Sequence, residues 1–155
     1  QRARPAVLAG HLQPAGGVLR AWRAHDIFLR MHRSRLAGFI IDCQTADLET
    51  AAGFWSQALG LPLRGNASTD PGYRLLQNAP GDLHVEVQQV QHPSRVHLDI
   101  ESDDVEAEAL RLEALGARRV SAVKTWIVME APTGQRFCIV RPQSSRFAAE
   151  ANRWD

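Results

Sequence analysis

One pattern of secondary structure occurs twice in this chain, and the repeat limits the possible folds more than any other feature. From Leu36 onward, an apolar strand-like run, an amphipathic helix and several short strand-like runs follow one another, and the same order then returns. Each copy predicts a strand, a helix and three further strands. Such a unit carries a helix on one face of its sheet, so it must bury its remaining apolar surface against a partner. The second copy supplies that partner.

The two helices are the clearest part of the repeat. Asp47 is a good N-cap for the first helix, apolar residues follow at helical spacing, and Gly60 ends it. In the second copy Asp103, with Glu106 three residues later, resembles a capping box, and Gly116 ends the helix. The distance from cap to glycine is the same in both copies, so two helices of equal length are predicted.

Short strand-like runs follow each helix. They are LPLRG, YRLLQN and LHVEVQQV in the first copy and RRVSAV, WIVME and FCIVR in the second. The last two runs of each copy are joined by a turn segment with proline and glycine, at residues 78–82 and 130–135. We therefore predict an α+β fold of two tandem βαβββ modules, about residues 36–90 and 95–142, whose curved mixed sheets surround a concave cavity.

The first thirty residues do not share this pattern. Residues 1–30 contain several arginines and a patch rich in proline and glycine, and we expect them to form an N-terminal extension. Met31, which stands directly before the patterned region, is one candidate for the natural start of the protein. The alternative is that residues 18–31 form a helix, although helical spacing is kept only in part.

The duplicated domain is expected to cover residues 31–142 and to leave a C-terminal tail. Residues 143–155 lack strand alternation, but Phe147 and Trp154 are too apolar to remain in water without a reason. We expect this tail to pack on the domain.

Charge and cysteine content argue against several function classes. The formal net charge is +1 and no basic run is interleaved with aromatic residues, which argues against a nucleic-acid partner. No apolar run approaches the roughly 18 residues that span a bilayer. Cys43 and Cys138 are the only cysteines, which favours the reducing cytoplasm over a disulfide framework. The expected partner is a small molecule, and free sheet edges would permit a homodimer.

Three stretches of the chain resemble a known family. FWSQALGLPL, HLDIESDDVEAEALRLEALGARRV and APTGQRFCIV, together with the duplicated plan, resemble the vicinal oxygen chelate superfamily in its glyoxalase-like, bleomycin-resistance-like branch. The resemblance covers about residues 36–142. This superfamily includes metal-dependent lyases, isomerases, epimerases and ring-cleaving dioxygenases, and also metal-free proteins that sequester a drug. The fold alone therefore does not choose the chemistry.

The resemblance implies a divalent metal held by side chains from four strands, two in each module. The second-module histidine falls on His97, but the matching first-module position is Ile40, which cannot bind a metal. The last-strand glutamate falls on Cys138, whose thiolate suits zinc. Glu86 is the remaining candidate, although a shift of one residue would place Val85 there and turn Glu86 away. Two expectations stay open: a reduced zinc or iron site of Glu86, His97 and Cys138, or no metal.

Other side chains could act without a metal. Asp42 and Asp99 occupy matching strand positions on the faces expected to line the cavity, where a carboxylate with a raised pKa could abstract a proton. The simpler interpretation is that both accept hydrogen bonds from nearby arginines. Arg95 or Arg136 could bind an anionic ligand. The expected pocket residues are Ile40, His84, Trp55 and Trp126, of which the two tryptophans could equally belong to the core.

Two functions follow from these residues. In the first, the chain is a binding protein or a metal-free enzyme whose cavity holds a small, partly aromatic or anionic molecule, and the apolar residue at position 40 favours it. In the second, it is a metal-dependent lyase, isomerase or dioxygenase with the reduced metal site. The sequence leaves open whether the chain is an enzyme.

Overall fold

The computed structural model describes residues 31–65 and 71–155. The expected N-terminal extension lies outside the described residues. The elements, in chain order, are β1 (His32–Cys43), α1 (Leu48–Leu59), β2 (Tyr73–Leu76), the 3-10 helix η1 (Pro80–Asp82), β3 (His84–Gln89), β4 (Arg95–Ser102), α2 (Val105–Ala114), β5 (Arg118–Val123), β6 (Trp126–Glu130), β7 (Arg136–Val140), α3 (Phe147–Glu150) and β8 (Asn152–Trp154). In this part of the chain, no helix is both long and apolar enough to cross a membrane.

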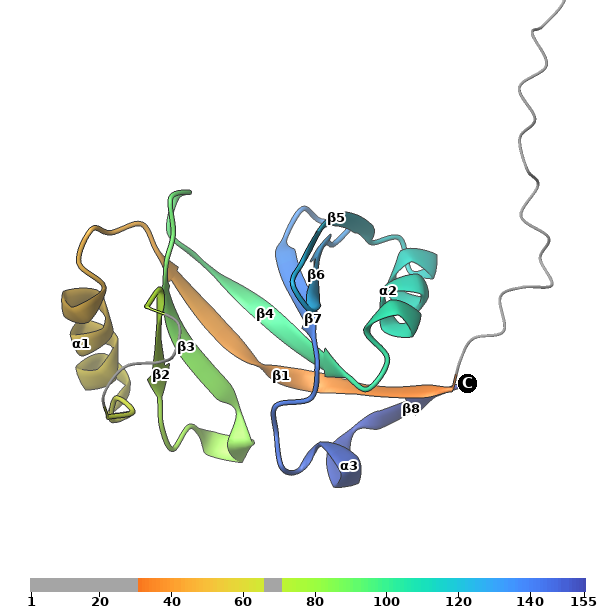
Figure 1. Cartoon of the computed structure of the whole chain (residues 1–155), viewed down its shortest axis with the longest axis horizontal. Coiled ribbons are helices and arrows are strands. Elements are labelled where there is room, and N and C mark those ends of the chain that lie inside the picture. Colours follow the sequence, from red (N-terminus) through yellow and green to blue (C-terminus); the bar gives the residue numbers. More distant parts are fainter. Residues whose placement is uncertain (1–30, 66–70) are drawn as a thin grey trace, which may run out of the picture.

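A mixed sheet of eight strands forms the body of the molecule. Seven strands follow the order β2-β3-β1-β4-β7-β6-β5, and β8 pairs with β1 outside this path. The two modules meet edge to edge, because β1 of the first pairs antiparallel with β4 of the second. In Figure 1 the strands of the two modules stand on either side of β1 and β4, so that the sheet curves. This confirms the predicted α+β fold.

Each module has its own apolar core beneath its helix. In the first, Ile41, Val85 and Val87 point toward α1 and pack around Ala52. In the second, Met129 and Ile139 belong to a cluster that includes the buried face of α2. Figure 1 shows the two helices at opposite ends of the sheet. Since strand side chains alternate between faces, the neighbours of these core residues point to the concave face.

The first helix begins and ends where the sequence predicts, whereas the second differs by one residue at each end. The Asp47 side chain accepts a hydrogen bond from the backbone of Thr50, and Gly60 adopts a left-handed φ of 66°. The N-cap of α2 is Asp104 and not Asp103. Asp103 instead accepts a hydrogen bond from the backbone N–H of Arg33 at 2.6 Å. The C-cap of α2 is Leu115, one residue before Gly116, so the helices have 12 and 10 residues and the prediction of equal length was wrong.

Two strands differ from the sequence prediction. LPLRG does not form a full strand and contributes one isolated bridge, between Leu63 and Leu76. The first strand begins at His32, earlier than the apolar run from residue 38 indicated. Polar residues precede that run, so alternation gave no signal for this extension.

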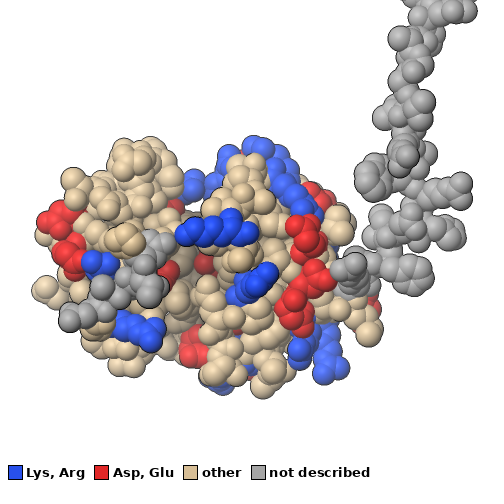
Figure 2. Space-filling view, in the orientation of Figure 1, with Lys and Arg blue, Asp and Glu red and all other residues tan. Residues whose placement is uncertain are grey.

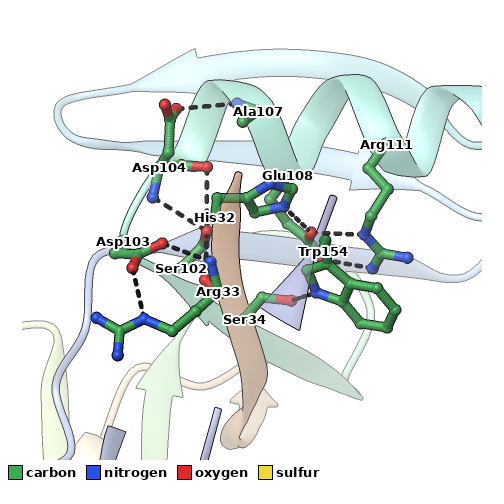
Figure 3. A network of polar contacts seen from close by, with 10 residues as sticks. All are labelled: His32, Arg33, Ser34, Ser102, Asp103, Asp104, Ala107, Glu108, Arg111 and Trp154. Atoms are coloured by element: carbon green, nitrogen blue, oxygen red, sulfur yellow. Dashed lines mark hydrogen bonds and ion pairs between the residues drawn. The ribbon is translucent and has the colours of Figure 1, made fainter. Parts of the chain in front are cut away.

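The C-terminal segment binds the start of β1. Strand β8 pairs antiparallel with β1, with Trp154 opposite His32. The indole N–H of Trp154 donates to Ser34 Oγ at 2.7 Å, and the Arg111 guanidinium lies 3.9 Å from the ring centroid. The fully buried Glu108 lies 2.8 Å from His32 Nε2 and also pairs with Arg111 (Figure 3). This network joins β1, α2 and β8.

A second group of contacts holds the same segment where it leaves β7. Phe147 is buried. One oxygen of the buried Glu101 accepts hydrogen bonds from the backbone N–H groups of Gln143, at 2.6 Å, and Ser144, at 3.0 Å. Arg35 Nε lies 3.6 Å from the other oxygen. The segment is therefore fixed at both of its ends.

Candidate functional site

The concave face of the sheet encloses a cavity of about 510 Å³ between the two modules. Both modules contribute inward-pointing side chains from their strands. On the face shown in Figure 2, basic side chains lie over the second-module half and along its border with the first-module half. Of the residues predicted from the sequence, the cavity brings together Ile40, Asp42, Glu86, His97, Asp99, Trp126 and Cys138.

Strand register explains why these residues meet. Ile40 on β1 lies opposite His97 on β4 and opposite Glu86 on β3. On the other side of β4, Asp99 pairs with Cys138 of β7. Residues two apart on a strand share a face, so His97 and Asp99 both point into the cavity. Four strands far apart in sequence thus supply one polar cluster.

Asp42 and His97 form the best-defined pair of the cluster. His97 Nδ1 lies 2.9 Å from Asp42 Oδ2, and Arg95 Nε donates to the same oxygen at 3.2 Å. Burial favours the neutral form of Asp42, but the hydrogen bonds from His97 and Arg95 outweigh it and lower the pKa of this carboxyl. An ionised carboxylate is only an acceptor, so Nδ1 carries the proton of the pair. Asp42 therefore orients the His97 ring.

Asp99 lies on the other side of the imidazole, and its pKa shifts in the direction opposite to that of Asp42. Its Oδ1 is 3.6 Å from His97 Nε2. Among the described residues, this buried oxygen has no hydrogen-bond partner. Burial raises the pKa of Asp99 to about 6, and His97 offsets this only in part. Asp99 can therefore exist in both protonation states near neutral pH.

Cys138 completes the cluster beside Asp99. Its thiol takes part in a hydrogen bond with Asp99. Burial and the nearby carboxylate charges raise the pKa of Cys138 to about 12. The thiol is protonated at neutral pH, so it is a weak nucleophile in this setting.

Glu86, His84 and Trp55 lie away from this cluster. Glu86 points into the cavity, which decides the question of strand register, but its carboxylate pairs with His84 Nε2 at 3.1 Å. Burial alone would lower the pKa of His84, but the hydrogen bond with Glu86 and the charges of Glu86, Asp99 and Glu101 together outweigh it and raise the pKa. His84 is not among the residues that line the cavity. Trp55 packs on the α1 core behind the sheet, so of its two expected places it takes the core and not the pocket.

The cluster also bears on the metal that the resemblance implies. One donor atom each from His97, Asp99 and Cys138 lies within 4.8 Å of the others. The unpartnered oxygen of Asp99 and the anchoring of His97 by Asp42 both suit a metal, since metal-bound histidines usually donate their other N–H to a carboxylate. Glu86 is not in this group, because β1 separates its strand from β4 by two strand spacings, about 10 Å. The donors fit zinc or iron with Asp99 in place of Glu86.

Some cavity residues were not expected from the sequence. Tyr73 and Gln88 line its first-module side, and the Gln88 side-chain amide donates to the Tyr73 hydroxyl at 2.7 Å. Gln88 follows Glu86 by two residues, so alternation places it on the same face as Glu86, although it was not named as a pocket residue. Tyr73 gave no signal, because β2 is short and its partner strand is set by the tertiary fold.

The fold and the cavity together define a protein of the vicinal oxygen chelate type, with two βαβββ modules and a polar cluster between them. The model of the glyoxalase-like domain matches residues 38–140. The chain belongs to this family of glyoxalase-like domains. No curated protein sequence matches it significantly.

Solved structures support the same fold. The methylmalonyl-CoA epimerase of Mycobacterium tuberculosis matches with a TM-score of 0.52 and 19% identity, over 74% of this chain and 91% of that one. A hypothetical protein from Bacillus halodurans C-125 matches with a TM-score of 0.50 and 14% identity, over 72% and 98% of the two chains. At this level of identity the similarity shows the fold alone.

Proposed function

We propose that this protein binds a small organic molecule in the cavity and transfers a proton at it through His97 and Asp99, with Asp42 as the positioning residue. The observation that carries the proposal is the alignment of these three side chains. His97 Nδ1 is 2.9 Å from Asp42, and its other nitrogen is 3.6 Å from Asp99 at the cavity wall. A base fixed by a buried carboxylate is a common arrangement for general acid–base catalysis.

The roles of the three residues follow from their environments. Because Nδ1 donates to Asp42, the neutral imidazole carries its lone pair on Nε2. This nitrogen can accept the proton of a ligand C–H bond, whose electron pair moves onto an adjacent carbonyl oxygen. Protonated Asp99 can donate a hydrogen bond to that oxygen, and its pKa near 6 keeps this form accessible.

The rest of the cavity suits an organic ligand with an apolar part. Trp126, Val128 and Val140 line the second-module side, and Ile40 stands between Glu86 and His97. Apolar walls with a few oriented polar groups are typical of small-molecule sites. Ile40 also supports a site that works without the four-ligand metal of related enzymes.

Deuterium exchange into simple carbon acids tests whether the site transfers a proton. Two carbon acids, 2-oxobutanoate and phenylacetone, are incubated with the protein in D₂O, and loss of their α-proton signals is followed by NMR. We expect exchange at least tenfold above buffer for one of them. His97→Gln should return the rate to that of buffer and Asp99→Asn should lower it at least tenfold. Glu49→Gln, an exposed carboxylate of α1, is the control and should have no effect.

Two results would contradict the proposal to different extents. If a probe shows saturation transfer from the protein but no deuterium exchange, it binds without proton transfer, and the function is reduced to binding. Neither binding nor exchange for either probe would overturn it.

A second function is supported by one specific observation, the grouping of His97, Asp99 and Cys138 donors within 4.8 Å. These residues would hold a zinc or iron ion, which acts as a Lewis acid on a ligand oxygen when it is bound. Elemental analysis of protein purified without chelators should then find about one equivalent of metal, and the His97→Ala variant should lose it. Absence of metal from the wild type after reconstitution under reducing conditions would contradict this second function.

A further inference from the structure

Two arginines, Arg95 and Arg136, line the cavity next to His97. We infer that they form a subsite for a carboxylate group of the ligand, whose apolar body then lies on the second-module wall. This inference rests on the proposed function, because it assigns the ligand class of the same cavity.

The strand register places both arginines next to His97 on the inward face of the sheet. Arg95 precedes His97 by two residues on β4, so their side chains share a face about 7 Å apart along the strand. Strand β7 runs parallel to β4, with Phe137 paired to Leu98, which puts Arg136 next to His97 on the neighbouring strand. Arg95 also shares the Asp42 oxygen with His97, so a group bound by Arg95 lies close to the imidazole.

Each guanidinium is fixed through one nitrogen and leaves the others for a ligand. Arg95 Nε lies 3.2 Å from Asp42, and Arg136 Nε lies 2.8 Å from Glu130. Among the described residues, no protein group accepts a hydrogen bond from the terminal nitrogens of these two arginines. A fixed planar fork with free donors matches the two oxygens of a carboxylate. The side chains are 43% and 29% exposed, so a ligand can reach them.

The charges of the cavity favour a carboxylate over a phosphate. Asp42, Glu86 and Asp99 also line it, so a dianion would meet several like charges. A carboxylate carries one negative charge and therefore meets less repulsion from these groups than a dianion does. The shared chemistry of the two kinds of anion is bidentate hydrogen bonding to arginine, and the probes below separate them.

The wall beside the arginines changes from charged to apolar along β7. Its inward positions are Arg136, Cys138 and Val140, and Val128 of β6 pairs with Cys138. Trp126 extends this apolar surface. A ligand with its carboxylate at Arg136 would place its apolar body on these residues. The atoms between the two ends would lie by Cys138 and its strand partner Asp99, beside His97.

Three aromatic probes of similar shape test the subsite: benzoate, its neutral analogue benzamide, and phenylphosphonate. Their affinities are measured by protein-observed NMR titration. We expect the wild type to bind benzoate more tightly than the other two. Arg95→Gln and Arg136→Gln should each weaken benzoate binding at least tenfold and change benzamide binding less than twofold. Arg136→Lys should fall between, because lysine keeps the charge and loses the planar fork.

Arg118→Gln is the matched control for Arg136→Gln. Arg118 pairs with the same carboxylate, Glu130, at 2.6 Å, but it is 64% exposed and does not line the cavity. The Arg118→Gln variant should bind benzoate with the affinity of the wild type. Thermal unfolding of each variant verifies that the fold is kept.

The remaining outcomes each overturn a stated part of the inference. Equal affinities for benzoate and benzamide, unchanged in the arginine variants, would overturn the subsite and leave small-molecule binding intact. Tighter binding of phenylphosphonate would overturn the choice of a carboxylate. If Lys124→Gln loses benzoate binding and the arginine variants keep it, the anion lies near Trp126, and its assignment to the two arginines is overturned. No binding of any probe would overturn the inference, and exchange of phenylacetone would still uphold the proposed function.

Discussion

Asp42 and Asp99 are the same kind of residue on adjacent strands, and both side chains are almost fully buried. Their pKa values nevertheless shift in opposite directions. Burial raises both, and Oδ1 of each carboxylate has no hydrogen-bond partner among the described residues, but Asp42 Oδ2 receives hydrogen bonds from both His97 and Arg95, whereas His97 Nε2 stays 3.6 Å from Asp99. The partners of a buried carboxylate therefore decide whether it positions another group or takes part in proton transfer.

Replacement of Asp99 should make stability less dependent on pH. Its pKa is raised to about 6 in the folded protein, so folding favours the protonated form and the free energy of unfolding falls as the pH rises through 6. Asp99→Asn removes this loss. We expect the variant to be more stable than the wild type at pH 8, by up to about 3 kcal/mol, with no gain at pH 4. Urea unfolding at both values measures this, and an equal gain at both would contradict it.

The orientation of His97 should depend on the ionised form of Asp42. In Asp42→Asn the amide can present an N–H to Nδ1, so we expect the Nδ1-protonated tautomer to lose population. The ¹⁵N chemical shifts of the labelled imidazole report the tautomer. Arg95→Gln is the control, since it keeps Asp42 ionised and should leave the tautomer unchanged. A purely structural role for Asp42 predicts no change in either variant.

At the scale of elements, the approach of β1 to β3 depends on one glycine. A Cβ added at Gly38 would lie 1.7 Å from the backbone oxygen of His84. Only a residue without a side chain lets the two strands pair at this point. The same pairing sets the register that aims Glu86 into the cavity.

Substitution of Gly38 should therefore be far more costly than substitution of another glycine. We expect Gly38→Ala to lower the free energy of unfolding by about 3 kcal/mol or more, because the strands must separate. Gly53→Ala is the matched change within α1, where nothing lies within 4 Å of an added Cβ. It should raise the free energy of unfolding by about 0.5–1 kcal/mol. Chemical denaturation measures both, and similar values for the two variants would count against the close approach.

At the scale of the whole molecule, β1 connects most of the structure. It pairs with β3 in its own module, with β4 of the second module and with β8 of the C-terminal segment. The cavity lies between modules joined by the β1–β4 pair, so the geometry of the site depends on both modules at once. Cooperative unfolding of the two modules is expected for this reason.

The C-terminal segment should contribute measurably to stability. Trp154→Ala removes the contact with Arg111 and the hydrogen bond to Ser34, and we expect it to lower the free energy of unfolding by about 2–3 kcal/mol. Arg153→Ala, on the same strand with an exposed side chain, should cost less than about 0.5 kcal/mol. Equal effects of the two variants would indicate that the indole contributes nothing beyond the strand itself.

The sequence by itself determined the duplicated fold, the first helix with its caps, and most of the inward-pointing residues of the strands. These depend on local signals, namely apolar periodicity, N-caps and turn residues, and they are present in a single segment of chain. The second helix begins one residue later than predicted because Asp103 and Asp104 are both suitable caps, and Arg33, which is distant in sequence, binds the first of them.

Only the tertiary structure decided how these residues work together. His97 was expected from the sequence, but its fixation by Asp42 and its proximity to Asp99 and Cys138 follow from strand pairing. The same pairing removed Glu86 from the group of potential metal donors, and the packing of α1 on the sheet placed Trp55 behind it. The distances between side chains on different strands depend on which strands are neighbours, and so do the pKa shifts that burial causes. No single segment of the sequence determines this strand order.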